Sequence, residues 1–355
     1  HAFSADHGAV ATVVPILNGA ITLVSVLYGE PDELVNAGDT TSIDCTAIAS
    51  RTLRGTVAGL HQDEKALIST GLLLRTFVLP TAEDFFLSGV PASPQDILLT
   101  RVADEASGAV VNGFILRRNV NAPDGAELPP FDVASTELFA PATATLSILG
   151  AGAEDVFSLT EVHTANSQLT VPFLVDQLGA TTRPYFALPE DRLLPGDLQK
   201  LHLSTAADEN GTNRTADAYF RSPVDRTMAL GAPLVPPTVG VTVSGGSLLP
   251  RVTFVPQAGY DQATTVLFEQ AVVPTLVSVT MTEAYAAGRA GGYSLAIPDL
   301  GTVAGFDPAW SLRPGSAVLW SATRTGGTVP FGRNQRPADG AVQQSAFLRG
   351  TLPAS

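Results

Sequence analysis

The sequence predicts an all-β protein built of two to three tandem antiparallel β-sandwich domains. Turn-forming residues are frequent and spread along the 355 residues, with 32 glycines and 26 prolines. They separate short apolar runs of strand length, a pattern typical of all-β proteins. Several runs also alternate apolar and polar residues with a period of two, and no heptads or long amphipathic helical faces occur.

The length of the chain indicates more than one hydrophobic core, since single cores rarely grow beyond about 250–300 residues. Two stretches rich in turn residues or prolines suggest where the domains meet, namely DEASG at 104–108 and GAPLVPP at 231–237. The second is predicted to be a linker or the entry to an edge strand. We therefore expect three domains, covering residues 1–103, 104–230 and 231–355.

Residues 9–29 form an apolar run without charge. A membrane span is one interpretation, but Pro15 and many β-branched residues argue against a helix. Asn18-Gly19 in the middle of the run is a strong hairpin signal. The run is thus predicted to form two strands joined by a tight turn.

Residues 51–102 contain five strand-length segments, and turn residues separate several of them. They are LRGTVAGL, ALISTG, LLLRTFVL, DFFLSGV and QDILLTRV. Their order and the turn GVPASPQD resemble the carboxypeptidase regulatory-like, or transthyretin-like, β-sandwich. The resemblance covers about fifty residues, implies a folding module and carries over no catalytic residue.

The remaining two thirds of the chain also read as strands. Asn210-Gly211 predicts a hairpin turn, GAGAED at 150–155 a second one, and residues 194–203 leave room for one short helical turn. In the last third, Val239, Val241 and Val243 are expected on one face of a strand. Both regions resemble fibronectin-III or immunoglobulin-like sandwiches without the cysteine pair. The closing segment also resembles modules of secreted bacterial proteins, which implies export.

Charge and cysteine content restrict the possible partners. The chain has 34 acidic and 20 basic residues and a net charge of −14, so nucleic acid is not an expected partner. The single cysteine, Cys45, excludes an intrachain disulfide. Its role stays open between a buried apolar residue, an intermolecular disulfide and a reactive thiol.

No motif of nucleophilic, metal-dependent or nucleotide-dependent catalysis is present. The sequence therefore predicts no enzyme, no cofactor and no metal site. One alternative uses His1, whose amine and ring could bind copper together with His7, His61 or His163. The competing interpretation of His1 is a processing point.

Aromatic residues supply the candidate binding site. Trp310 lies in a turn-rich segment near Phe306 and Tyr293. The three rings could form a platform for a glycan or an anchor for a protein partner. The alternative is that they pack one end of the last sandwich.

These observations predict a non-catalytic structural or binding protein, exported to a bacterial periplasm or the extracellular space. One form is an accessory subunit that docks on the periplasmic face of a membrane protein complex, for example a photosynthetic reaction-centre and light-harvesting complex. The uncharged run 9–29 would then meet an apolar partner. The alternatives are a carbohydrate-binding surface protein and a copper-binding protein. The identity of the partner and the oligomeric state stay open.

Overall fold

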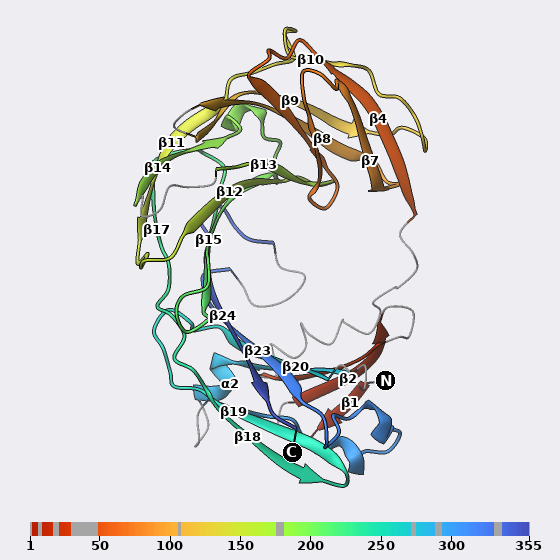
Figure 1. Cartoon of the computed structure of the whole chain (residues 1–355), viewed down its shortest axis with the longest axis vertical. Helices are drawn as coiled ribbons and strands as arrows, with labels where there is room; N and C mark the ends of the chain where they lie inside the picture. Colours follow the sequence, from red (N-terminus) through yellow and green to blue (C-terminus); the bar gives the residue numbers. More distant parts are fainter. Residues whose placement is uncertain are drawn as a thin grey trace.

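The structure, a computed structural model, describes residues 2–5, 9–16, 21–29, 49–105, 108–174, 181–270, 275–287, 293–329 and 336–354. Strands dominate these ranges, and three sandwich units follow one another along the chain (Figure 1). The all-β fold class is confirmed. Helical structure within the described ranges is limited to α2 (Glu283–Ala287) and the 3₁₀ turns η2 (Glu190–Arg192), η3 (Leu300–Thr302) and η4 (Pro308–Trp310).

Unit 1 comprises residues 50–132 and has two facing sheets, with strand orders β10-β4-β7 and β6-β5-β8-β9. Their apolar faces enclose a core that includes Leu53, Ile68, Phe85 and Ile115. The five strands expected between residues 51 and 102 are all present. The strands of the unit are β4 Ser50–Ala58, β5 Glu64–Thr70, β6 Leu74–Val78, β7 Asp84–Pro91, β8 Gln95–Glu105, β9 Gly108–Val120 and β10 Phe131–Asp132.

Unit 2 comprises residues 142–229. Its outer sheet has the order β14-β11-β17, and its inner sheet contains β16, β15, β12 and β13. Ile148, Tyr185, Leu201 and Phe220 lie in the core between them. The strands are β11 Ala142–Leu149, β12 Val156–His163, β13 Gln168–Leu174, β14 Thr182–Ala187, β15 Leu198–Thr205, β16 Asn213–Phe220 and β17 Arg226–Ala229.

Unit 3 combines residues 238–352 with the first strands of the chain. Its outer sheet is β18-β19-β22, and its inner sheet contains β21, β20, β23 and β24. The strand β3 pairs in parallel with β21, from Thr22 opposite Thr275 to Tyr28 opposite Met281. The strands are β1 Ala2–Ala5, β2 Ala9–Ile16, β3 Ile21–Tyr28, β18 Thr238–Ser244, β19 Ser247–Thr253, β20 Ala263–Gln270, β21 Thr275–Thr282, β22 Ser294–Ala296, β23 Val318–Gly327 and β24 Val342–Leu352.

The inner sheets of units 2 and 3 form one continuous sheet, because β16 pairs with β24. Its order is β1-β2-β3-β21-β20-β23-β24-β16-β15-β12-β13. The molecule is an arc in which this long sheet lines the inside, while the outer sheets of units 2 and 3 lie on the outside (Figure 1). We call its inward side the concave face.

The strand pairings depart from the expected domain boundaries at two places. The antiparallel pairing of β8 with β9 crosses the boundary between residues 103 and 104, and Ile115 of β9 belongs to the core of unit 1. Residues 21–28 belong to unit 3, where Val24 and Val26 are buried. Both departures follow from burial of apolar side chains that the local turn signals did not reveal.

Three local predictions have clear outcomes. The hairpin of β2 and β3 is confirmed, although its turn at Asn18-Gly19 lies outside the described residues. The hairpin at Asn210-Gly211 is confirmed by the pairing of β15 with β16. The helical turn within 194–203 is wrong, because β15 begins at Leu198 and buries alternate residues.

Residues 150–155 do not form a hairpin turn either. The strand before them, β11, pairs with β14 and β17, and the strand after them, β12, pairs with β13 and β15. The segment therefore connects the two sheets of unit 2. Within the described ranges, no helix is long and apolar enough to cross a membrane.

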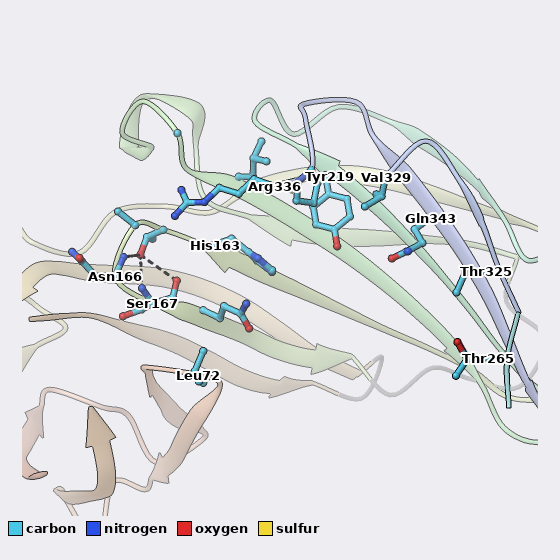
Figure 2. Close-up of a pocket in the computed structure, with 16 residues that line it drawn as sticks. Leu72, His163, Asn166, Ser167, Tyr219, Thr265, Thr325, Val329, Arg336 and Gln343 are labelled. Carbon is cyan, nitrogen blue, oxygen red and sulfur yellow. Dashed lines mark hydrogen bonds between the residues drawn. The ribbon is translucent and has the colours of Figure 1, made fainter. Parts of the chain in front are cut away.

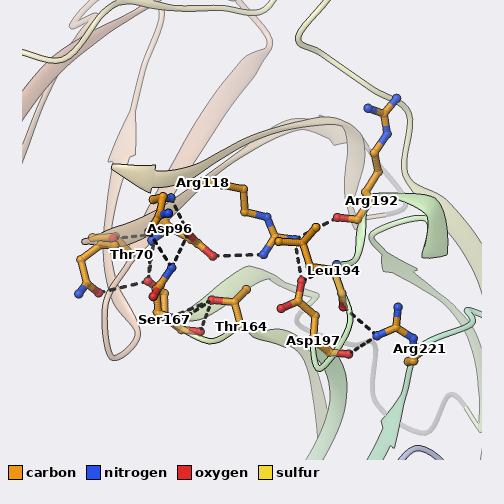
Figure 3. Close-up of polar contacts among 12 residues, drawn as sticks. Thr70, Asp96, Arg118, Thr164, Ser167, Arg192, Leu194, Asp197 and Arg221 are labelled. Carbon is orange, nitrogen blue, oxygen red and sulfur yellow. Dashed lines mark hydrogen bonds and ion pairs between the residues drawn. The ribbon is translucent and has the colours of Figure 1, made fainter. Parts of the chain in front are cut away.

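The first joint connects units 1 and 2 through side chains. Arg118 of β9 lies 3.1 Å from a carboxylate oxygen of Asp96 and 2.7 Å from one of Asp197, and it donates a 3.0 Å hydrogen bond to the carbonyl of Arg192 (Figure 3). Both aspartates are almost fully buried. An apolar cluster lies at the same joint and contains Leu98, Val111, Phe114, Val162, Leu169 and Val171.

The second joint connects units 2 and 3 around two buried arginines. Arg214 of β16 and Arg324 of β23 both pair with Ala346 of β24. Arg214 forms an ion pair with Glu154 and donates to the carbonyl of Gly231 at 2.7 Å. Arg324 lies 3.1 Å from a carboxylate oxygen of Glu283. The second joint is therefore both a backbone ladder and a set of buried charges.

The predicted linker 231–237 is held in place at this joint. In addition to the bond from Arg214, the Tyr260 hydroxyl donates to the carbonyl of Ala232 at 2.6 Å. Gln257 donates to the carbonyl of Pro233 and accepts from the backbone N–H of Val235. Bound at four positions, the segment is an ordered part of the joint.

Candidate functional site

The concave face carries polar side chains because the strands of the long sheet alternate. In β15, Leu201 and Leu203 are buried in the core of unit 2, while Lys200 and His202 are half-buried on the opposite side. The same alternation holds in β16, where Asp217 lies on the concave side. A sheet with one face packed on a core and the other face open to solvent shows this alternation.

Hydroxyl groups cover the middle of the concave face. Thr215 of β16 and Ser345 of β24 share a hydrogen bond of 2.6 Å between their hydroxyls. Thr325 of β23 stands opposite Ser345 in register. Further along, the hydroxyls of Thr265 and Thr280 are 2.9 Å apart. These side chains offer both hydrogen-bond donors and acceptors.

An open groove of about 620 Å³ lies on this face (Figure 2). It begins at Leu72 of unit 1, passes over β12 and β16, and reaches Thr265 of unit 3. Residues of all three units line it, and none of the lining residues that the structure describes is Asp, Glu or Lys. They are Leu72, His163, Thr164, Ala165, Asn166, Ser167, Gln168, Gly196, Leu198, Tyr219, Thr265, Thr325, Val329, Arg336, Pro337 and Gln343.

Glu161, beside the groove, is buried and already has two side-chain partners. Its carboxylate lies 2.7 Å from Lys200 Nζ and 3.0 Å from His163 Nε2. Burial alone raises the pKa of Glu161, but the hydrogen bonds and charges of His163 and Lys200 outweigh it and lower this pKa to about 2. The carboxylate is therefore ionised and bound within the protein.

A second acid beside the groove, Asp217, also has a histidine partner. Asp217 Oδ1 is 2.5 Å from His202 Nδ1. Tyr219 packs edge-on against His163 with 6.1 Å between ring centroids. Burial, together with the nearby Asp217 and Glu161, raises the pKa of Tyr219 to about 12, so its hydroxyl keeps its proton. The floor of the groove thus presents neutral hydrogen-bonding groups.

The aromatic residues predicted from the sequence lie elsewhere, on unit 3. Phe306 and Trp310 form an edge-to-face pair with ring centroids 5.5 Å apart. Both are half-buried and pack against the core beside the start of β19. Tyr293 lies beyond the other end of β19, where Arg324 lies 5.2 Å from its ring centroid. The structure brings two of the three residues together and places the third apart.

Residues considered for metal binding are also placed. Among the described residues, no three His, Cys, Asp or Glu side chains gather as ligands for a metal ion. His1, His7 and Cys45 lie outside the described residues. His61 is exposed in the turn after β4, and His163 contacts Glu161.

Sequence reasoning did not identify the groove residues. The available signal was the alternation in segments such as LQKLHLST and NRTADAYF, which marks one polar face on each strand. The pairing of β16 with β24 decides which of these polar faces lie side by side, and no local sequence pattern predicts that pairing.

Comparisons with known proteins assign no family to the chain. No family model matches the chain, and no curated protein matches it. The solved structures similar to it include a marsupial T cell receptor with 9% sequence identity. That alignment covers 86% of this chain and 100% of the receptor chain, with a TM-score of 0.15. A likeness of this size carries no argument about function.

Proposed function

We propose that the protein is a non-catalytic structural or binding protein of an exported compartment, and that it holds a partner macromolecule on its concave face. The observation that carries this proposal is the continuous long sheet, whose polar side spans two units and ends against the third. A surface of this extent is suited to a macromolecule, since specific protein interfaces bury about 800 Å² on each partner.

The two joints support the same proposal because they fix the surface before a partner arrives. Arg118 bridges two buried aspartates at the first joint, and Arg214 and Arg324 are buried at the second. A preorganised surface loses less conformational entropy on binding than a mobile one. The arc is therefore built as a rigid support.

We also propose the finer identity of the units. Unit 1 is a carboxypeptidase regulatory-like, or transthyretin-like, module, and units 2 and 3 are fibronectin-III or immunoglobulin-like sandwiches without a cysteine pair. Support comes from their facing pairs of small sheets and from the turn spacing in the sequence. An experimental structure that placed the strands of unit 1 in one sheet would contradict this assignment.

An accessory subunit on the periplasmic face of a membrane complex is one form of this function. The uncharged run 9–29 supports that form less than its composition suggests. Val24 and Val26 of β3 are buried in unit 3 and so face no outside partner. The concave face is the stronger candidate for the contact.

Photo-cross-linking in the cells that make the protein tests the proposal. A benzophenone amino acid is placed at Thr265 on the concave face or, as the matched control, at Leu149 on the outer sheet, which is 56% exposed. We expect a discrete high-mass adduct from position 265 and none from position 149. Equal adducts from both positions, or none from position 265, would contradict the proposal.

A further inference from the structure

We propose that the groove on the concave face binds an extended glycan chain, rich in hydroxyl groups and without positive charge. This inference rests on the proposed function and names the class of ligand for the same face. The first observation is electrostatic. The chain carries a net charge of −14, yet among the residues that the structure describes no Asp, Glu or Lys lines the groove, and Arg336 is the one Arg in that described lining.

Two acids beside the groove are already bound within the protein. Glu161 is bound by Lys200 and His163, and Asp217 is bound by His202. What remains on the floor is a set of neutral polar groups. Carbohydrate hydroxyls donate and accept hydrogen bonds at once, and the side-chain amides and hydroxyls here do the same. They belong to Asn166, Gln168, Gln343, Thr265 and Thr325.

The length of the groove indicates a chain and not a single sugar ring. It runs across the strands, from His163 on β12 to Thr265 on β20. These strands are separated by β15, β16, β24 and β23 in the sheet order. Five strand spacings correspond to about 24 Å. An extended polymer that lies across the strands fits this shape.

Other extended polymers fit the groove less well. A peptide recognised as an added strand needs an unpaired strand edge. The floor strands β12, β15, β16, β24, β23 and β20 are all interior, with a paired neighbour on each side. The end strand β13 also contributes Gln168, whose backbone N–H and carbonyl are already bound to Gly71 and Leu73 of unit 1. Nucleic acid needs several cationic contacts to its phosphates, whereas Arg336 is the one Arg or Lys in the described part of the groove lining. The guanidinium of Arg336 can form an ion pair with a sugar that carries a carboxylate.

Affinity electrophoresis provides the test. The purified full chain is run through native gels that contain mixed-linkage β-glucan, xylan, galactomannan, alginate or chitosan, or the soluble envelope polysaccharide of the source organism. We expect at least one neutral or uronate polysaccharide to retard the protein. Chitosan controls for charge alone, because its ammonium groups are attracted to a chain with a net charge of −14 wherever acids lie on its surface; its retardation should therefore be the same for the wild type and for Gln343→Ala.

Two variants of one groove residue sharpen the test. Gln343→Ala removes hydrogen-bonding groups and is expected to weaken binding about 3- to 10-fold, the effect of losing one or two hydrogen bonds. Gln343→Glu keeps the size and adds a negative charge, so it is expected to weaken alginate binding most. Gln62→Ala, in the exposed turn after β4, is the matched control and should migrate as the wild type does.

Each outcome separates this inference from the proposed function. Absence of retardation by every polysaccharide, or equal retardation of wild type and Gln343→Glu, overturns the glycan inference. A protein adduct from position 265 in the cross-linking experiment, found together with absence of retardation, leaves the proposed function standing with a protein as the partner. Absence of both overturns both.

Discussion

The two joints of the arc hold their units together by different means. At the first joint, units 1 and 2 meet through an apolar cluster and through Arg118, which two buried aspartates share. Among the described residues, the backbone-to-backbone hydrogen bonds between the two units lie at the turn after β5. There Gln168 donates its N–H to the carbonyl of Gly71 at 2.6 Å and accepts from the N–H of Leu73 at 3.1 Å.

At the second joint, a strand ladder carries the connection. β16 pairs with β24 from Asn213 opposite Phe347 to Ala218 opposite Val342. A slip of one residue would turn the polar side chains of one unit into the core of the other, so the register is strongly specified. The second joint therefore fixes the relative position of its two units through backbone hydrogen bonds, whereas the first joint holds its units together through a few side chains.

The largest expected effect comes from removing a buried charge at the second joint. Arg214→Ala leaves Glu154 without its cationic partner in a buried site, so the free energy of unfolding should fall by about 3–5 kcal/mol. Urea denaturation measures the loss, and Arg251→Ala, at an exposed position in β19, is the control. Because the ladder persists, small-angle scattering should still report the same arc. A loss below about 1 kcal/mol would show that the charge is not needed there.

The first joint should respond differently to an apolar truncation. Leu169 is fully buried in the cluster between units 1 and 2, and Leu169→Ala is expected to cost about 3 kcal/mol. Spin labels on units 1 and 2 should show a broader distance distribution than in the wild type. The exposed Leu194→Ala, near the same joint, should leave that distribution unchanged. An unchanged distribution in Leu169→Ala would contradict the side-chain account of this joint.

A change of charge in β12, on the concave face beside the first joint, should have a smaller effect. Glu161→Gln removes a carboxylate that Lys200 and His163 bind, which should cost about 2 kcal/mol at pH 7. The folded-state pKa of about 2 lies below the ordinary 4.5. The stabilisation is therefore fully present above pH 4.5 and is lost as the pH falls toward 2.

The measurement is the difference in unfolding free energy between wild type and Glu161→Gln over a pH series. Comparing the two proteins removes the contribution of the other acids. The difference should shrink steadily below pH 4.5. A difference that stays constant down to pH 3 would contradict the lowered pKa of this carboxylate.

The smallest expected effect concerns the segment clamped at the second joint. A Cβ atom at Gly231 would lie 2.4 Å from the Tyr260 hydroxyl and 2.7 Å from its ring. Gly231→Ala should therefore cost about 1–2 kcal/mol through overpacking. Gly240→Ala in β18, where a Cβ would meet open space, is the control. A thermal midpoint for Gly231→Ala equal to that of Gly240→Ala would show that this close approach is not needed.

Local sequence patterns predicted the strands well and the assembly poorly. The segments in residues 51–102 and the hairpin of β2 with β3 follow from turn residues and apolar runs. The pairing of β3 with β21 and of β16 with β24 could not be predicted, since each joins segments more than a hundred residues apart. Such pairings depend on which apolar faces pack together, and many registers share the same alternation.

The candidate site was missed for a related reason. The prediction relied on rare, large side chains, so Trp310 was an obvious candidate. The groove consists of common strand residues such as Thr265 and Thr325. Threonine occurs in strands because of its β-branched side chain, so its presence in the sequence does not distinguish a binding face from an ordinary solvent-facing one.

The parallel pairing of β3 with β21 has a consequence for the timing of synthesis. Thr22 and Thr275 are partners in this pairing, and they are 253 positions apart (275 − 22). At about 5–20 residues per second, the partner strand leaves the ribosome about 13–50 s after β3 does. Units 1 and 2 are therefore fully synthesised before the ribosome has made the residues of unit 3 that bury Val24 and Val26. The edge of β3 that faces β21 must therefore stay without its partner while units 1 and 2 are synthesised, so unit 3 is the first unit to begin and the last to be completed.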